Sequence, residues 1–419
     1  MLRHDIACPF CGLCCDDLTI KSEPEQLTVE ANGCPLSQRG FNQSPHSGDT
    51  SHQPRIQGHD CSLNEAVTHA ADLLRHARLP LFGGLGTDVA GARAALRLAD
   101  RAGAVLDHMN SASMLRNLLA VQDSGWMTAT LGEVRNRVDL LVIFASDIEK
   151  HAPRFYERFF NNAESMFAQD TAVRELIMIG SDADASSVRG DAHTTSIPCP
   201  KDRLGDIAMT LRALLQGRPL QAENVAGIPV VQLREIVTRL ADAHYGVIAW
   251  AAAELDFPHA ELAVQAFSGL VKDLNATTRC SGLPLGGNNA DTTFSQVATW
   301  QAGFPTRISL ASGCPHFDPI QYNWERLLQS DEADLLLWIS AFDTQRTPPA
   351  GDTPGIVLGR AGMQCAQEPE VFIPVATPGL DHAGHVYRCD SVVAIPLRSL
   401  RVSDLPEVST VLHAITESL

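Results

Sequence analysis

The spacing of hydrophobic positions between residues 62 and 102 predicts a helix, then a strand, then a second helix. In residues 62–76, apolar side chains recur every three or four positions, as on the buried face of an amphipathic helix. Ser62 followed by Glu65 is the signature of a capping box, which predicts that a helix begins there. The apolar run at residues 79–82 predicts a short buried strand, and the Ala-rich segment 89–102 predicts a second helix.

The same alternation of helices and strands continues toward the C-terminus. The run VDLLVIFA at residues 138–145 is apolar throughout, as expected for a strand covered on both faces. The alternative for such runs is a buried helix, but short runs bounded by Gly or Pro favour strands. The pattern therefore predicts an α/β fold with doubly wound, Rossmann-like parallel sheets. The other predicted strands are at residues 104–107, 175–180, 245–250, 332–339 and 370–375, and the other predicted helices are at 230–243 and 259–274.

A polar stretch interrupts the pattern between residues 42 and 60. It reads NQSPHSGDTSHQPRIQGHD, and its Pro, Gly and Ser content predicts a linker or a long surface loop. Five of the eleven cysteines precede it, and the α/β alternation starts after it and starts again after Arg218. We therefore expect a small Cys-rich iron–sulfur-type module at residues 1–55, an α/β domain at 56–217, and a second α/β domain with a C-terminal extension at 218–419.

Composition and charge exclude several classes of protein. Hydrophobic residues make up 45% of the chain and charged residues 19%, which is a globular composition. The net charge of −17 makes nucleic acids and anionic membranes poor partners, and no apolar run is long enough to predict a membrane-spanning helix. The start MLRHDIACPFCG has no features of an export signal. We therefore expect a cytoplasmic protein whose cysteines serve as metal ligands or free thiols.

The first 34 residues carry the candidate metal ligands. Cys8, Cys11 and Cys15 form the pattern C-x2-C-x3-C when Cys14 is skipped, and Cys34 adds a fourth thiolate. Thiolates bind both zinc and iron–sulfur clusters. A tight turn with three cysteines and a distant fourth suits a [4Fe–4S] cluster, whereas zinc usually binds two separated C-x2-C pairs. The spacing favours the cluster, with zinc or free thiols as the alternatives.

Longer motifs that include these cysteines resemble a known family. CPFCGLCCDDL at the N-terminus, ATLGEVRNRVDLL in the middle and HVYRCD near the C-terminus resemble the B subunit of formylmethanofuran dehydrogenase. That family belongs to the molybdopterin oxidoreductase superfamily, and the likeness extends over nearly the whole chain. The resemblance implies the α/β architecture of the superfamily and a subunit of a metallopterin enzyme.

One position departs from the family where its catalytic metal is bound. In the dehydrogenases, a cysteine shortly after a strand that ends in Asp ligates tungsten or molybdenum. The resemblance places its counterpart at Ser113, a hard donor where the metal needs a soft thiolate, and Leu115 and Arg116 add bulk beside it. Some relatives of the superfamily do use a serine ligand. The combined changes nevertheless indicate a dismantled site, so we do not expect a bound molybdopterin or tungstopterin.

The resemblance extends to a branch of the family without a redox function. Methylotrophic bacteria contain a formyltransferase/hydrolase complex that passes a formyl group between tetrahydromethanopterin and a methanofuran-like carrier and hydrolyses it to formate. Its chemistry lies in an amidohydrolase and a formyltransferase subunit. We therefore expect a noncatalytic structural subunit of formaldehyde-to-formate metabolism, with amidohydrolase-like, formyltransferase-like and further β-rich subunits as partners. The alternative is an active molybdenum- or tungsten-pterin formylmethanofuran dehydrogenase subunit.

Two further motifs are weaker site candidates. His151 and Arg154 in KHAPRF resemble a site-facing motif of the dehydrogenases and could orient a one-carbon oxyanion or a pterin phosphate, but a solvated pair or a subunit contact is the favoured interpretation. Gly84, Gly86 and Thr87 lie between a predicted strand and helix, where backbone N–H groups bind phosphate. A strand–helix turn that simply requires glycine is the favoured interpretation of these three.

Overall fold

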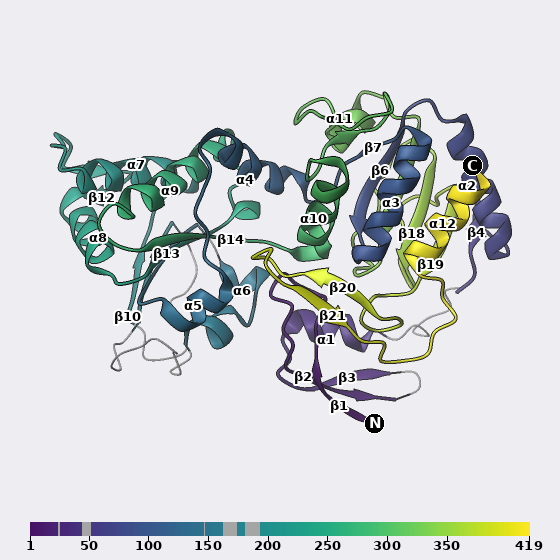
Figure 1. Ribbon diagram of the computed structural model, residues 1–419, viewed down its shortest axis with the longest axis horizontal. Helices are drawn as coiled ribbons and strands as arrows, with labels where there is room; N and C mark the ends of the chain where they lie inside the picture. Colours follow the sequence, from purple (N-terminus) through teal and green to yellow (C-terminus); the bar gives the residue numbers. More distant parts are fainter. Residues whose placement is uncertain (24–25, 44–51, 146, 162–173, 181–192) are drawn as a thin grey trace. The chain divides into compact units, whose positions relative to one another are not determined.

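A sheet that draws its strands from both ends of the chain dominates the computed structural model (Figure 1). The structure describes residues 1–23, 26–43, 52–145, 147–161, 174–180 and 193–419. The sheet has the order β16-β15-β7-β6-β17-β18-β19-β4-β5. Strands β7 to β19 in this order run parallel, whereas the outer strands are antiparallel. The strands are β4 (Arg55–Ile56), β5 (His59–Asp60), β6 (Pro80–Gly86), β7 (Val105–Leu106), β15 (Ile308–Ser309), β16 (His316–Phe317), β17 (Leu335–Ser340), β18 (Gly355–Arg360) and β19 (Val371–Val375).

Both faces of this sheet are covered, as strand β17 illustrates. Leu335, Leu337 and Ile339 pack into one core with helices α2, α3, α10 and α12, whereas Leu336 and Trp338 pack on the other face with α11. Because side chains alternate along a strand, a strand buried on both sides reads as a continuous apolar run. The helices are α2 (Leu63–His76), α3 (Val89–Ala102), α10 (Asp291–Ala302), α11 (Trp324–Gln329) and α12 (Val408–Ser418). None of the helices in the described chain is both long and apolar enough to cross a membrane.

The middle of the chain forms a second unit. Unit 1 comprises Met1–Ser111 and Gly287–Leu419, and unit 2 comprises Ala112–Gly286. Unit 2 has its own parallel sheet, in the order β10-β9-β8-β13-β14, and its core is shared with helices α7, α8 and α9. Its strands are β8 (Leu140–Phe144), β9 (Glu175–Ile179), β10 (His193–Ile197), β13 (Gly246–Ala251) and β14 (Cys280–Leu285), with a small hairpin of β11 (Asn224–Val225) and β12 (Ile228–Pro229). Its helices are α5 (Leu131–Arg137), α6 (Ile148–His151), α7 (Leu204–Leu215), α8 (Val230–Asp242) and α9 (Ala260–Leu274), and α4 (Ser111–Ser124) begins at its boundary with unit 1.

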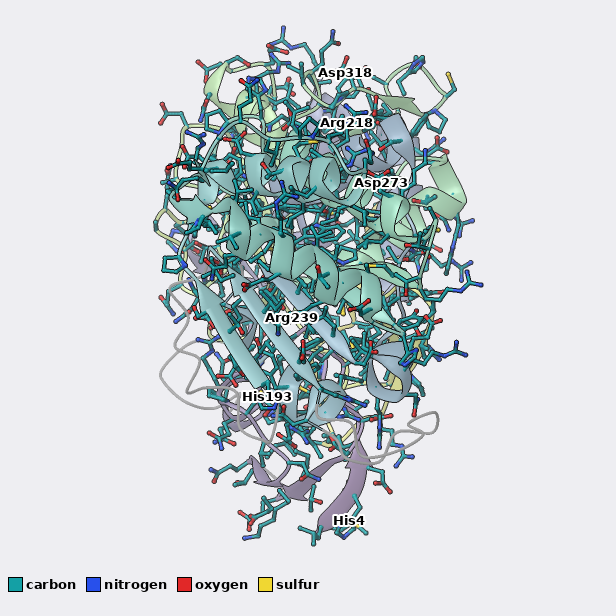
Figure 2. The ribbon with its side chains drawn as sticks, turned by 90° about the vertical axis from the view of Figure 1, so that its left-hand side faces the viewer. His4, His193, Arg218, Arg239, Asp273 and Asp318 are labelled. Carbon is teal, nitrogen blue, oxygen red and sulfur yellow. The ribbon has the colours of Figure 1, made fainter. Side chains whose placement is uncertain are left out.

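Ion pairs at the surface of unit 2 connect its helices to its sheet and to each other. Figure 2 labels one member of each pair, Arg239 and Asp273. Arg239 of α8 donates a hydrogen bond to Glu175 at the start of β9 at 2.8 Å. Arg212 of α7 donates one to Asp273 of α9, also at 2.8 Å. These side chains are partly exposed, so each pair contributes no more than about 1 kcal/mol, and the apolar core holds the unit together.

The N-terminal residues form a small module within unit 1. Its antiparallel sheet consists of β1 (Leu2–Ile6), β2 (Leu18–Ser22) and β3 (Leu27–Ala31), and helix α1 (Pro35–Asn42) follows. The module is bonded to later parts of unit 1. The backbone N–H of Cys389 donates to the Gly12 carbonyl oxygen at 2.8 Å, next to the hairpin of β20 (Gly384–Tyr387) and β21 (Ala394–Leu397). The segment is therefore part of a larger unit and does not stand apart from it.

The predicted α/β fold with parallel sheets is confirmed, but the structure divides the chain differently from the three expected segments. Helix α2 begins after Ser62, with the capping box to Glu65 in place. Residues 218–286 join unit 2, whereas residues 287–419 return to unit 1. The hydrophobic pattern locates strands but carries no signal for which strands pair, and the pairing of β6 with the distant β17 decides the division.

Strand β6 contains a bulge where it meets β17. The pairing register shifts between Trp338 and Ser340 of β17. Gly84 lies opposite this shift with a φ of +70°, and a Cβ atom there would lie 2.5 Å from the carbonyl oxygen of Ile339. Gly84 is therefore required both by its left-handed backbone and by the close approach of the neighbouring strand.

We expect Gly84→Ala to lower the free energy of unfolding by about 2–4 kcal/mol, because it combines left-handed strain with overpacking against Ile339. Gly303→Ala is the matched control, since Gly303 has a φ of +82° and a Cβ added there would meet no atom within 4 Å. The control should lose only the stability that left-handed strain costs, about 1–2 kcal/mol. Urea unfolding of both variants measures the difference, and equal losses would contradict the packing argument.

Candidate functional site

The four candidate cysteine ligands are buried in the N-terminal module. The backbone N–H of Cys8 donates to the carbonyl oxygen of Cys15 at 2.8 Å, which closes a turn that contains Cys11. Cys34 follows strand β3. None of the four residues is more than 9% exposed. Four buried thiols in so small a module are unusual unless they share a structural task.

Cys34 lies at the N-terminus of helix α1. Its sulfur accepts a hydrogen bond from the backbone N–H of Ser37 at 3.4 Å, and the Ser37 hydroxyl accepts one from the backbone N–H of Cys34 at 2.8 Å. This is a capping box in which a thiol replaces the usual hydroxyl. The helix N-terminus favours negative charge, so Cys34 is placed where a thiolate is stabilised.

The four thiols lie close enough to influence one another electrostatically. Burial raises the pKa of Cys8, and the charges of Cys11, Cys15 and Cys34 raise it further. Burial likewise raises the pKa of Cys11 to about 12, with contributions from Cys15 and Cys34. Without a bound cation Cys8 and Cys11 therefore stay protonated at neutral pH. A positively charged group among them would reverse this effect by stabilising the thiolates.

The arrangement does not match a site for a single metal ion. Among the described residues, no group of three or more His, Cys, Asp or Glu side chains is placed to hold one. A zinc site needs its sulfur ligands about 2.3 Å from one ion, and zinc and free thiols stay the alternatives to the cluster. An iron–sulfur cluster is larger than one ion and spreads its four ligands around a cage. The donor set fits such a cluster, which stays a prediction.

Cys14 differs from the other cysteines of the module in its backbone conformation and in its contacts with the rest of unit 1. It has a φ of 46°, and its sulfur lies 3.9 Å from the carbonyl oxygen of Tyr387. Its side chain packs in an apolar cluster with Ala290, Phe342 and Val386. Cys14 therefore helps to attach the module to the rest of unit 1, and its omission from the ligands stays a prediction.

A pocket of about 340 Å³ lies between the module and the main sheet of unit 1. Phe10 and Arg39 of the module form one wall, and residues that follow β17, among them Phe342 and Asp343, form another. Arg360 at the end of β18 also lines it. Strand β6 continues through α3 to β7 on one side, whereas β17 continues to β18 on the other. The pocket thus adjoins a switch point at the carboxyl ends of the strands, where α/β folds bind ligands.

Arg360 gives this pocket a buried positive charge. It is only 3% exposed, and its guanidinium donates to the carbonyl oxygens of Phe342 at 2.9 Å and Gly40 at 2.7 Å. In the described chain no carboxylate forms an ion pair with it, and its guanidinium lies 5.5 Å from the centroid of the Phe10 ring. Burial lowers its pKa to about 10, although Asp381 opposes the shift. A buried cation without a paired anion is unfavourable, so the pocket is suited to an anionic ligand.

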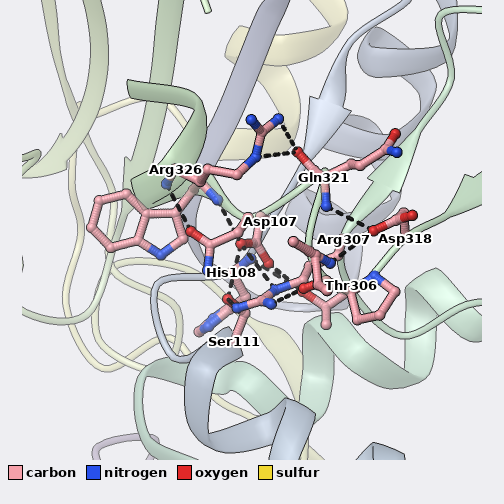
Figure 3. A network of polar contacts seen from close by, with 12 residues as sticks. Asp107, His108, Ser111, Thr306, Arg307, Asp318, Gln321 and Arg326 are labelled. Carbon is pink, nitrogen blue, oxygen red and sulfur yellow. Dashed lines mark hydrogen bonds and ion pairs between the residues drawn. The ribbon is translucent and has the colours of Figure 1, made fainter. Parts of the chain in front are cut away.

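A buried polar network fixes the chain at the end of β7 (Figure 3). The Asp107 carboxylate is fully buried and accepts hydrogen bonds from the hydroxyls of Ser111 at 2.9 Å and Thr306 at 2.8 Å. It also accepts one from the backbone N–H of Trp324 at 2.9 Å, and Arg307 lies 3.6 Å away. The oxygens of this carboxylate are engaged in structure, so Asp107 positions the start of α4 and is not available as a base.

The next residues continue the network without a free catalytic group. His108 accepts a hydrogen bond at Nδ1 from the backbone N–H of Asn110 at 3.0 Å, which leaves Nε2 to donate to the carbonyl oxygen of Asn289 at 3.3 Å. Burial lowers the pKa of His108 to about 3, so it is neutral. The Asn110 side chain donates to Asp291 at 3.1 Å and accepts from Arg346 at 2.6 Å. The end of β7 is therefore bonded to the segment before α10.

Ser113 lies in the first turn of α4, shortly after β7 and Asp107. It is partly buried and belongs to unit 2. In the same helix, the Arg116 guanidinium donates to the carbonyl oxygen of Ala252 at 2.6 Å. Arg116, one of the two bulky residues expected beside Ser113, is thus bonded to the backbone of unit 2.

His151 and Arg154 each face a carboxylate of unit 2. His151 forms a hydrogen-bonded ion pair with Glu254, and this bond lowers the pKa of the Glu254 carboxyl against the effect of burial. The Arg154 guanidinium donates to Glu157 at 2.6 Å. Both residues therefore have structural partners within their own unit, and their proposed ligand contacts stay a prediction.

The predicted phosphate-binding residues do not form a strand–helix loop. Gly84 and Gly86 lie within β6, and the buried Thr87 follows. The Asp88 side chain accepts a hydrogen bond from the backbone N–H of Gly91 at 2.9 Å and so caps helix α3. Because a carboxylate already occupies the start of the helix, this site does not fit a phosphate.

Sequence reasoning missed the Arg360 pocket. A charged residue at the end of the apolar run GIVLGR is a signal for a site at a strand end, but a weak one. The walls of the pocket come from three segments far apart in the chain, and only the strand pairing brings them together.

Solved structures identify the class of fold. Acetylene hydratase from Pelobacter acetylenicus matches with a TM-score of 0.66 over 99% of this chain and 69% of that chain, and its 10% identity shows the fold alone. A chain of the formyltransferase/hydrolase complex (FhcABCD) from Methylorubrum extorquens, solved with methylofuran, matches with a TM-score of 0.73 and 26% identity over 87% of this chain and 98% of that one. The fold is therefore that of the molybdopterin oxidoreductase type.

Sequence comparison identifies the family within this class. No protein-family model matches the chain. The B subunit of tungsten-containing formylmethanofuran dehydrogenase 2 from Methanocaldococcus jannaschii is 28% identical over 418 residues, which cover 96% of this chain and 94% of that protein. The Fhc B subunit of the formyltransferase/hydrolase complex from Methylorubrum extorquens is 28% identical over 337 residues, which cover 79% and 87%. The chain is a homologue of the B subunits of formylmethanofuran dehydrogenase and of the Fhc complex, which confirms the resemblance found in the sequence.

The buried carboxyl of Asp107 should make unfolding pH-dependent. Burial raises its folded pKa to about 6, against an ordinary value of 3.8. The folded state therefore keeps the proton to higher pH, and this contribution to stability is present below about pH 4 and lost as the pH rises through about 6. Asp107→Asn removes the titration, so the stability of the wild type relative to the variant should fall over this range in urea unfolding.

Asp318→Asn provides a control of opposite sign. Backbone N–H groups of Gln321 and Ile320 lower the pKa of Asp318. Its contribution is therefore present above its ordinary pKa and lost as the pH falls through the lowered value. Parallel pH profiles for the wild type and Asp107→Asn would contradict the assignment.

Proposed function

We propose that this chain is the structural B subunit of a formyltransferase/hydrolase complex in tetrahydromethanopterin-linked conversion of formaldehyde to formate. The observation that carries the proposal is its match to 98% of a chain of the FhcABCD complex. The sequence resemblance also places Ser113 where the dehydrogenases have a metal-binding cysteine. Its partners would be amidohydrolase-like, formyltransferase-like and further β-rich subunits. Formyl transfer and hydrolysis require no redox change, so loss of the metal ligand is compatible with this role.

The polar residues that precede Ser113 in the chain support a structural role. Asp107 is saturated by hydroxyl and backbone donors, and His108 is neutral with both ring nitrogens engaged. A general base needs a free acceptor within reach of a substrate proton. These residues instead stabilise the end of β7 and the start of α4. The chain would therefore contribute to the complex by presenting surfaces to catalytic subunits.

A cytoplasmic location is part of this proposal. None of the eleven cysteines, all of which the structure describes, forms a disulfide bond, which is compatible with a reducing compartment. The complex would encounter both formyl carriers, tetrahydromethanopterin and the methanofuran-like carrier, in the same compartment.

Co-expression with an amidohydrolase-type and a formyltransferase-type subunit tests the function. We expect a stable assembly that transfers and hydrolyses formyl groups. Ser113→Ala should leave both activities unchanged, because a neutral hydroxyl contributes at most one hydrogen bond, about 0.5–1.5 kcal/mol of stability. Failure of the wild-type chain to assemble with these subunits, or loss of activity by orders of magnitude in Ser113→Ala, would overturn the proposal.

An active metallopterin subunit is the second candidate. The 28% identity to a tungsten-containing subunit over 96% of the chain favours it, as does the pocket lined by Arg360. The residues present do not fit a metallopterin, however, since position 113 offers no thiolate and Asp88 already caps α3. Metal analysis of the purified complex separates the two candidates. Stoichiometric tungsten or molybdenum would establish the second, and Ser113→Cys alone should not create viologen-linked formate oxidation, because Leu115 and Arg116 remain.

We further infer that Cys8, Cys11, Cys15 and Cys34 hold a [4Fe–4S] cluster. Their burial, their mutual electrostatic influence and the helix N-terminus at Cys34 support this assignment. When bound, the cluster would supply positive charge that turns four buried thiols into thiolates. The four side chains would then hold the turn and helix α1 together, which stabilises the module.

Reconstitution with iron and sulfide tests the cluster. The wild type should take up both and develop the broad visible absorption of an iron–sulfur protein, whereas Cys34→Ser should lose most of it. Cys314→Ser is the matched control, because Cys314 is exposed and lies outside the module. Iron uptake that is equal in all three proteins, or absent from the wild type, would contradict the assignment.

A further inference from the structure

A groove on the outside of unit 1 carries positive charge on a strongly acidic protein. It has a volume of about 730 Å³ and is lined by residues of α3, α10 and α12 and of the segment after β15. Its floor is apolar, with Ala94 and Leu310 no more than 5% exposed. Arg93, Arg97 and His413 line it as cationic or titratable side chains, and the carboxylate of Asp100 lines it as well. None of these groove residues belongs to the thiol set or to the pocket beside Arg360.

The two arginines lie on one face of α3, because residues four positions apart are neighbours along a helix. Both are exposed, and within the part of the chain that the structure describes neither guanidinium forms a hydrogen bond or an ion pair. The chain has a net charge of −17, so acidic side chains are abundant elsewhere. Two neighbouring arginines without partners in such a chain favour a ligand that brings its own carboxylates.

Helix α10, which contributes Gln301 and Ala302 to the groove, also carries an exposed tryptophan. Trp300 of α10 is 56% exposed and precedes Gln301, which lines the groove. Its ring packs edge-on against Tyr387, with 5.5 Å between centroids, so it is held in place on the surface. Tryptophan and arginine are the residue types that most often dominate binding energy at protein interfaces.

The shape of the lining favours a protein segment over a small molecule. Ala90, Arg93, Arg97 and Asp100 line one side, and all four are exposed along a single helix. Small-molecule sites instead enclose most of the surface of their ligand. The negative net charge of the chain disfavours nucleic acid as the occupant.

We propose that this groove binds an acidic segment of a partner subunit. Two carboxylates of the segment, spaced by about one helical turn, pair with Arg93 and Arg97, and an apolar side chain packs on Ala94 and Leu310. The proposal rests on the proposed function, since it takes its partner from the other subunits of the complex. Beyond the proposed function, it specifies where on this chain the partner binds and that the bound segment is negatively charged.

Charge reversal in the assembled complex tests the proposal. The double variant Arg93→Glu/Arg97→Glu should bind the co-expressed catalytic subunits at least about tenfold more weakly than the wild type, because it brings like charges together. Arg218→Glu/Arg234→Glu is the matched control. It makes the same change in charge at two exposed positions of unit 2 and should leave affinity unchanged. Binding of the wild type should also weaken as salt rises, and binding of the double variant should not.

A crosslinker identifies the occupant. Benzoylphenylalanine in place of Gln301 should, on illumination of the complex, attach to a partner peptide that contains neighbouring Asp or Glu residues. Reversing those acidic residues to Lys should restore binding of Arg93→Glu/Arg97→Glu.

The outcomes separate the two proposals. A wild-type chain that fails to assemble with the co-expressed subunits overturns the proposed function. A complex that forms normally with Arg93→Glu/Arg97→Glu, or that crosslinks at position 301 only to a second copy of this chain, overturns the groove proposal and leaves the proposed function standing.

Discussion

The pairing of β6 with β17 is the contact on which unit 1 depends. It joins strands from opposite ends of the chain into one parallel sheet, and the close approach at Gly84 makes it specific. The same pairing creates the switch point beside the Arg360 pocket. It also gives the N-terminal module its neighbours, since the carbonyl oxygens that Arg360 bonds belong to the module and to the residues after β17. The thiol set and the pocket therefore lie next to each other because β6 and β17, which are distant in the sequence, are neighbours in the sheet.

Charge within unit 1 is arranged in two contrasting ways. Arg360 and Asp107 are buried, so their environments fix their hydrogen-bond partners with little freedom. Arg93 and Arg97 are exposed and have no intramolecular partner in the described chain. Buried charges of the first kind specify a unique local structure, whereas exposed charges of the second kind remain available to another molecule. In the structural role proposed for this chain, the buried charges would keep its shape and the exposed charges would be recognised by a partner.

Local signals predicted much of this structure, and contacts between distant residues account for the remainder. The cap at Ser62, the limits of α3 and the buried run at β8 follow from spacing and hydrophobicity alone, and these elements form where expected. The cysteine spacing likewise located the buried thiols. The unit boundaries and the Arg360 pocket depend on which strands become neighbours, which no local pattern records. Gly84 does require glycine, as the favoured interpretation expected, but it lies at a bulge within β6 and not in a strand–helix turn.

The insertion of unit 2 into unit 1 sets an order for folding during synthesis. The strands of unit 2 that the structure describes lie between Ala112 and Gly286, so its sheet can close while the last third of the chain is still being made. Strands β6 and β7 emerge earlier but must wait for β17 to β19. Throughout this interval they expose unpaired edges and apolar faces, the features that make nascent chains prone to aggregate. The first half of unit 1 therefore needs protection on the ribosome until the C-terminal strands arrive.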